Sequence, residues 1–236
     1  MRIFLCRLTL HENLFFATRE IGRLYETRDY LHNYALTYAL GLVTTPYFQR
    51  DQVPRYAEQL SELNEYGIYV TPARGVEVHY ALSTFKYADN HYHVQMEPGR
   101  LNTPSFGRAK EIAVGSQFEF FVIVREQLPK PFPHWIRLGK WSSKAIVESQ
   151  EYATIKDGVG EFSAACPLNP LDVSSAPIVY DLISMPPASL IHNAKMNGAH
   201  YELDNGRIKI PAGMQYRFPQ AETQAQENPK RKRKAT

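Results

Sequence analysis

Cysteine is scarce in this chain: only Cys6 and Cys166 are present, far apart in the sequence. Two isolated cysteines do not make the disulfide framework of a small secreted domain, and no second pair completes a zinc site. We therefore expect reduced thiols in a cytoplasmic protein that has no metal site and no cofactor.

Long apolar runs are absent as well. No window approaches the ~20 apolar residues that a membrane-spanning helix requires. Near the amino terminus, Arg7 interrupts the short apolar stretch before a signal-peptide core could form. These absences predict a soluble protein with no membrane partner.

An excess of charge is also missing from most of the chain. The formal net charge is +3, but basic and acidic residues balance up to Pro219, and the surplus lies in the run Lys230–Lys234. With 44% hydrophobic and 12% aromatic residues, residues 1–219 have the composition of a single folded body. Residues 220–236 are predicted to be a disordered basic tail. Any nucleic-acid surface on the folded body must therefore be a local patch.

The hydrophobic pattern predicts a strand over 2–10, and then helices over 30–40 and 54–66, the first capped by Asp29 and ended by Gly41. Strands are predicted over 67–72, 76–87 and 116–125, with further short strands and a hairpin at Asp204–Gly206. The polar segment 88–110 is predicted to be a long loop-like insertion. This order indicates an α+β fold: a ferredoxin-like or RNA-recognition-type sheet with helices on one face, plus additional strands and long loops.

Two clusters of basic residues carry the functional prediction. The first precedes the first helix, and the second lies in the segment WIRLGKWSSK, where a glycine turn follows a strand pattern. Cations hold phosphates, while aromatic rings stack on unpaired bases, so the clusters indicate single-stranded RNA. The predicted RNA-binding residues are Arg19, Arg23, Arg28, Asn33, Tyr87, Arg137, Lys140, Trp141, Ser142 and Lys144.

Each of these residues also has a purely structural interpretation. Arg19, Arg23 and Arg28 could form surface ion pairs with nearby acidic residues, and Trp141 could be a core tryptophan. Further contacts to RNA, to DNA or to a partner protein are expected from Arg74, Lys86, Arg100, Asn102 and Arg108.

No arrangement of residues requires catalysis or metal binding. His11, His32, His134 and Lys144 could in principle supply a base and a cation, but their spacing does not demand it. His91 and His93 lie two residues apart without a carboxylate or cysteine to complete a ligand set. We expect no catalytic residue.

The block HENLFFATREIGRLYETRDYLHNYALTYALGL, together with RLGKWSSKA and NPLDV, resembles the CRISPR-associated Cas-five (Cas5) family of the RAMP superfamily, in its type I-D branch (Csc1). The resemblance implies a non-catalytic subunit of a Cascade surveillance complex in antiviral defence. Such a subunit binds the 5' handle of the crRNA and caps one end of the backbone. It contacts the Cascade backbone subunit and large subunit, and lies close to the PAM of the target double-stranded DNA.

One departure from the wider superfamily limits what the resemblance transfers. Many relatives carry a glycine-rich loop near the carboxyl terminus, whereas Gly198, Gly206 and Gly213 are scattered here. No loop contacts are therefore transferred to this sequence.

Two alternatives remain open from sequence. Some related subunits cut CRISPR precursor RNA without metal, so a metal-independent endoribonuclease is one of them. The other is a nuclear RNA-binding protein, because the tail segment PKRKRK has the composition of a nuclear localisation signal.

Overall fold

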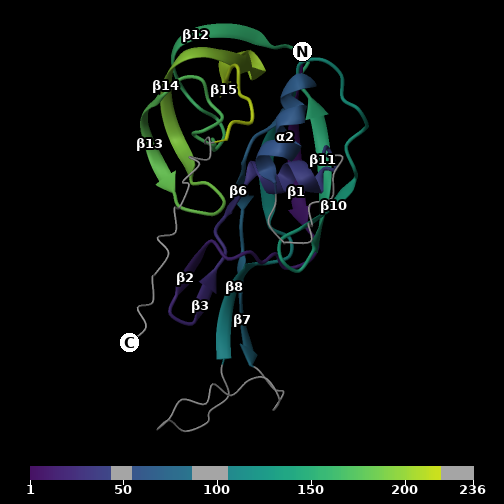
Figure 1. Cartoon of the computed structure of the whole chain (residues 1–236), viewed down its shortest axis with the longest axis vertical. Coiled ribbons are helices and arrows are strands. Elements are labelled where there is room, and N and C mark those ends of the chain that lie inside the picture. The colour runs from purple at the N-terminus through teal and green to yellow at the C-terminus, as the bar shows by residue number, and fades with distance from the viewer. Residues whose placement is uncertain (44–54, 87–105, 219–236) are drawn as a thin grey trace, which may run out of the picture.

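The computed structural model describes residues 1–43, 55–86 and 106–218, and these form a β-rich molecule (Figure 1). Its main sheet has seven strands. In spatial order they are β10 (Trp135–Leu138), β11 (Ser143–Glu151), β1 (Arg2–Leu10), β9 (Gln117–Val124), β6 (Ala73–Glu77) and β4 (Tyr30–Leu31), with β5 (Ile68–Val70) also paired to β9. The predicted strands over 2–10 and 116–125 are confirmed, and they pair antiparallel at the centre of this sheet.

Two α-helices lie on one face of the main sheet: α1 (Asn33–Ala39) and α2 (Tyr56–Glu65). Both were predicted, and Gly41 and Gly67, at φ 66° and 62°, follow them as expected. The ferredoxin-like arrangement is not confirmed. In the described residues the two helices follow one another instead of alternating with pairs of strands.

The predicted start of α1 was wrong. Residues Tyr30 and Leu31 pair with β6 as strand β4, so the helix begins later and His32 is its N-cap instead of Asp29. The Tyr34 backbone N–H donates to His32 Nδ1 at 3.2 Å, which leaves Nε2–H to donate to the Ala188 carbonyl at 3.2 Å. Burial lowers the pKa of His32 to about 4, so this cap is a neutral imidazole at pH 7.

A second sheet of four strands packs beside the main one. Its order is β12 (Lys156–Ser163), β14 (Leu190–Leu203) and β13 (Pro177–Ile183), with β15 (Ile208–Pro211) also paired to β14. The predicted Asp-Asn-Gly turn is confirmed as the 3-10 turn η1 (Asp204–Gly206) between β14 and β15.

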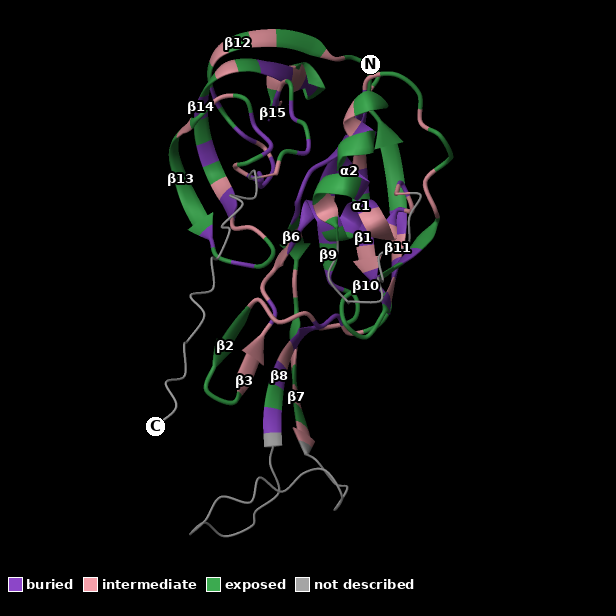
Figure 2. Ribbon diagram, in the orientation of Figure 1, coloured by how far each residue is buried: buried purple, intermediate pink, exposed green. Residues whose placement is uncertain are grey.

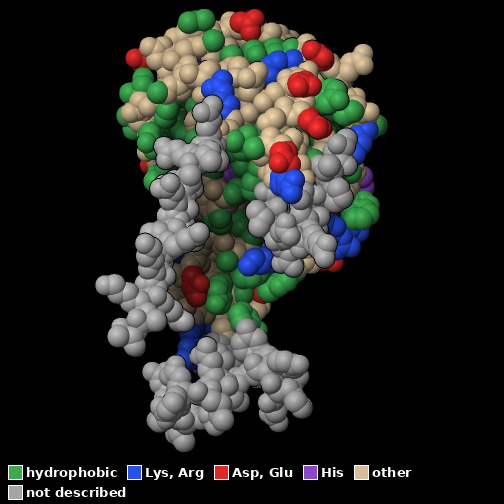
Figure 3. All heavy atoms as spheres, viewed as in Figure 1, with side chains coloured by type: hydrophobic (Ala, Val, Ile, Leu, Met, Phe, Trp, Pro, Cys, Tyr) green, Lys and Arg blue, Asp and Glu red, His purple; other side chains and the backbone are tan. Residues whose placement is uncertain are grey.

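A third sheet forms an arm that projects away from the body (Figure 2). Its strands are β2 (Arg19–Ile21), β3 (Leu24–Glu26), β8 (Phe106–Ile112) and β7 (Tyr80–Lys86). The prediction of a loop over 88–110 was wrong at its end, because residues from Phe106 onward belong to β8; residues 88–105 lie outside the described part. Figure 3 shows Lys and Arg side chains on the arm and along the flank of the body where β10 and β11 lie.

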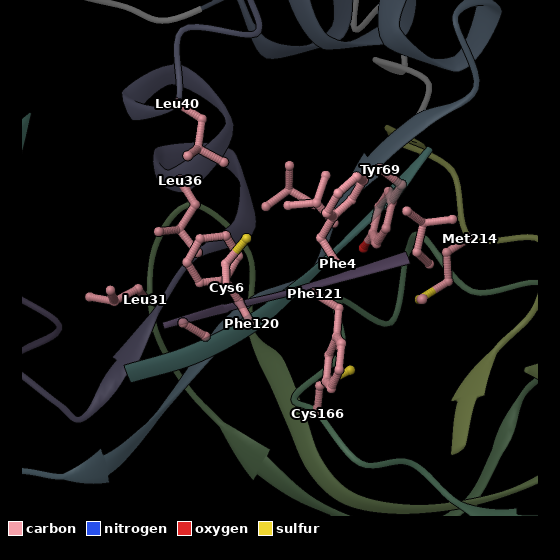
Figure 4. Close-up of a cluster of buried hydrophobic side chains, with 14 of the residues drawn as sticks. Phe4, Cys6, Leu31, Leu36, Leu40, Tyr69, Phe120, Phe121, Cys166 and Met214 are labelled. Atoms are coloured by element: carbon pink, nitrogen blue, oxygen red, sulfur yellow. The ribbon is translucent and has the colours of Figure 1, made fainter. Parts of the chain in front are cut away.

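The hydrophobic core lies on both sides of the central strands (Figure 4). Alternate residues of a strand point to opposite faces, so Cys6 and Phe120 meet Leu36 and Leu40 of α1 on one side. On the other side Phe121 points toward Cys166, in the chain that leads from β12 to β13. One apolar cluster therefore joins the helices, the main sheet and the second sheet.

Candidate nucleic-acid interface

The hairpin formed by β10, its turn and β11 carries the second predicted cluster. Ile136 and Leu138 are buried, so the alternating residues Trp135 and Arg137 face outward. Gly139 has φ 71°, and a Cβ atom there would lie 2.6 Å from the Phe15 carbonyl oxygen. Only glycine allows this close approach, which fixes the turn against the segment that follows β1.

Glu12 holds this hairpin in shape. Its carboxylate accepts from Arg137 Nη1 at 3.1 Å and from the Lys144 backbone N–H at 2.7 Å. Arg137 also donates to the Ser142 carbonyl at 3.0 Å. The ion pair is exposed and of modest strength. Arg137 and the Ser142 backbone therefore have a structural role, while the Lys140 side chain projects from the turn into solvent.

Trp141 lies on the surface, as predicted for a base-contacting residue. Its side chain is 51% exposed, and its ring stacks on that of Phe15 with 4.6 Å between centroids and 27° between planes. Phe15 is buried and covers one face of the indole. The alternative of a core tryptophan is excluded by this exposure.

The arm carries the first predicted cluster. Arg19 Nη2 lies 2.8 Å from Glu26 and Lys110 Nζ lies 3.0 Å from the same carboxylate, so the ion-pair interpretation holds for Arg19. Hydrogen bonds from Lys110 and Arg19 lower the pKa of Glu26. The carboxylate therefore stays ionised and neutralises part of the positive charge on the arm.

A shallow, open groove of about 300 Å³ lies on the arm. Arg23 and Arg108 line it together with Ile21 and Leu24, and the Arg108 backbone N–H donates to the Arg23 carbonyl at 2.8 Å. The turn between β2 and β3 thus meets β8, far away in sequence, and brings these two arginines together. Arg28, by contrast, lies half-buried in the loop between β3 and β4, outside this groove.

The segment between β1 and β2 connects the hairpin to the arm. Leu14 exchanges two backbone hydrogen bonds with Ile112 at the end of β8, and the Phe15 carbonyl accepts from the Lys140 backbone N–H at 2.9 Å. This buried segment therefore contacts both the turn of the hairpin and the end of β8 where the arm joins the body.

Other predicted residues lie elsewhere. Asn33 is fully buried and donates to Asp172 and Tyr69, so its prediction as an RNA contact was wrong. Arg74 lies in β6, 3.8 Å from Glu119. Tyr87, Arg100 and Asn102 lie outside the described residues, and Lys86 ends β7 with a side chain that is also outside them.

No metal-binding cluster of three His, Cys, Asp or Glu side chains occurs in the described part of the chain. The predicted pair His91 and His93 lies outside it. Burial raises the pKa values of both Cys6 and Cys166 to about 12, as expected for unreactive core thiols. His32 is buried as the cap of α1, which removes it from the candidates for a general base.

Two residues of this surface, Trp135 and Lys110, are not among the RNA-binding residues predicted from the sequence. Trp135 is 51% exposed at the start of β10 and lies on the same face as Arg137 and Lys144. Alternation along WIRL could have identified it. Lys110 was assigned to the insertion, although Ala109 and Ile112 around it follow a strand pattern.

The fold and this surface define a class: a β-rich protein whose cations and exposed aromatic rings are suited to a single-stranded polyanion. The chain belongs to the family described as type I-D CRISPR-associated protein Cas5/Csc1, whose model matches residues 1–219. No curated protein matches the sequence. Within the described residues, no helix is long and apolar enough to cross a membrane.

Two solved structures resemble the chain at low identity. A chain of the type III-B Cmr-beta complex bound to cognate target RNA and AMPPnP has a TM-score of 0.47 and 9% identity, covering 82% of this chain and 86% of that one. A CRISPR protein from Archaeoglobus fulgidus has a TM-score of 0.40 and 12% identity, covering 86% and 95%.

Proposed function

We propose that this chain is a non-catalytic subunit of a type I-D CRISPR Cascade complex and binds the 5' handle of the crRNA. The observation that supports the proposal is that a chain of the Cas5/Csc1 family carries a cationic hairpin and a cationic arm, both contacted by the segment between β1 and β2. In this role it caps one end of the backbone, contacts the backbone and large subunits, and lies near the PAM of the target double-stranded DNA.

The chemistry of the surface supports binding of single-stranded RNA. Lys140 and Lys144 on the hairpin, and Arg23 and Arg108 on the arm, supply cations for phosphates. Trp141 presents an indole held from behind by Phe15, which suits stacking on an unpaired base. Contacts to a handle that spans both parts would select single-stranded RNA over a duplex, whose bases are already stacked.

The first test is incubation of the purified chain with a labelled CRISPR repeat RNA in EDTA at two salt concentrations. We expect binding that weakens as salt rises, because phosphate contacts release counterions, and no cleavage product. A discrete cut in EDTA would contradict the non-catalytic assignment and favour the endoribonuclease alternative. His11 and His134, both exposed, would then be the residues to replace.

A further inference from the structure

We infer that Trp135 is a second base-stacking platform for the same RNA, on the outer face of the main sheet. This inference rests on the proposed function and extends it to a residue outside the turn. Trp135 lies on β10, the edge strand of the main sheet, and half of its side chain is exposed.

The surroundings of Trp135 suit an anionic, aromatic ligand. Two cations flank the indole: the Arg137 guanidinium carbon and Lys144 Nζ each lie 5.6 Å from the ring centroid. Both lie over the ring near the outer limit of the cation–π range, about 6 Å, and are farther away than Lys110, which lies 4.0 Å from the ring centroid of Tyr80. Arg137 is already held by Glu12, so Lys144 is the cation that can contact a phosphate next to a base on the exposed part of this indole.

The same face of the main sheet continues from Trp135 across the neighbouring strands. Trp135 pairs with Ile146 on β11, Ile146 with Thr9 on β1, and Thr9 with Gln117 on β9. Directly paired residues share one face of a sheet, so these four side chains form a row, and all four are at least partly exposed. Sheet faces with exposed aromatic residues bind bases in common RNA-binding modules.

The two tryptophans differ in how they are held. Trp141 lies in the turn after β10 and stacks on Phe15. Trp135 is the first residue of β10 and lies on the outer face of the sheet. Arg137, Lys140 and Lys144 lie on the stretch between and beside them. The geometry points to a single strand that contacts both rings and passes the cations of the hairpin.

The test uses the fact that the chain contains only two tryptophans. In Trp141→Phe, all tryptophan fluorescence comes from Trp135, and in Trp135→Phe all of it comes from Trp141. Each full-length variant is titrated with a single-stranded CRISPR repeat RNA, and binding is followed in parallel by the anisotropy of a label on the RNA. We expect the RNA to quench the fluorescence of both variants.

Affinity gives the second readout. We expect Trp135→Ala to weaken RNA binding roughly fivefold to hundredfold, and Trp135→Phe, which keeps a ring, to stay within about threefold of the wild type. The control is Tyr66→Ala, which removes an exposed aromatic ring beside β5 at the opposite end of the main sheet. It should bind RNA like the wild type. Melting temperatures of all variants show whether each remains folded.

Two failures can be told apart. If the wild type binds the RNA but Trp135 fluorescence is unquenched and Trp135→Ala binds normally, only the Trp135 inference is overturned. If the wild type binds no RNA, the proposed function fails, and the inference fails with it. Equal weakening by Tyr66→Ala would also overturn the inference, because the effect would then not be specific to this face.

Discussion

Asp172→Ala is expected to destabilise the protein by about 3 kcal/mol at pH 7, the largest loss of stability predicted here. The buried carboxylate of Asp172 accepts hydrogen bonds from Asn33 Nδ2 at 2.9 Å, from the Tyr69 hydroxyl at 2.9 Å and from the Arg217 backbone N–H at 3.0 Å. Alanine removes the acceptor that the three donors share, and in the core the Tyr69 hydroxyl loses its acceptor while Asn33 keeps only its bond to Tyr69. Thermal unfolding should show a melting temperature lower by roughly 6–12 °C.

The control for this change is Asp157→Ala on β12, where the side chain is exposed. It should change stability by no more than about 0.5 kcal/mol. Equal melting temperatures for the Asp172 variant and the wild type would show that this network does not hold α1, β5 and the segment before β13 together.

Protonation of the Asp172 carboxyl makes the stability difference between the wild type and Asp172→Ala depend on pH. Burial raises the pKa of Asp172 from 3.8 to about 6, although its three hydrogen bonds act in the opposite direction. Between these two values the folded state binds more protons than the unfolded state, so the contribution of Asp172 to stability grows as pH falls. The stability difference between wild type and Asp172→Ala should therefore be larger at pH 4.5 than at pH 7.5.

The double variant Lys140→Glu/Lys144→Glu should weaken RNA binding by about 30- to 100-fold near 100 mM salt. Each lost phosphate contact removes about 0.7 from the salt slope for single strands, so two contacts should lower the slope by about 1.4. Both side chains lie on the hairpin surface, and unfolding should stay close to that of the wild type. Equilibrium binding across a salt series measures both quantities.

The matched control is Lys156→Glu/Lys195→Glu, which makes the same charge change on exposed residues of the second sheet. It should alter affinity only slightly, through the net charge of the whole molecule. Equal losses in the two double variants would mean that the hairpin provides no specific phosphate site.

Local patterns explain what the sequence predicted correctly. Strand β1 alternates from Phe4 onward, and the hairpin contains its first strand, its glycine turn and the start of its second strand within ten residues. The exposure of Trp141 follows from the same short segment, because Gly139 and Lys140 end β10 before the indole.

Long-range contacts explain the errors. Asn33 is buried because Asp172, 139 residues away, lies beside it, and no local pattern carries that information. Asp29 is not the helix cap that was predicted, because Tyr30 and Leu31 after it pair with β6. Lys110 was not predicted because it lies at the end of a polar stretch. This end becomes strand β8 of the arm through pairing with β3 and β7, which are distant in sequence.

The most direct measurement is photocrosslinking of the assembled type I-D complex, with 4-thiouridine placed in the 5' handle of the crRNA. Mass spectrometry then identifies the crosslinked peptides of this chain. Binding of the handle by hairpin and arm predicts crosslinks within residues 135–144 and within the arm strands β2, β3 and β8. Crosslinks confined to the second sheet, or a handle that crosslinks only to other subunits, would contradict it.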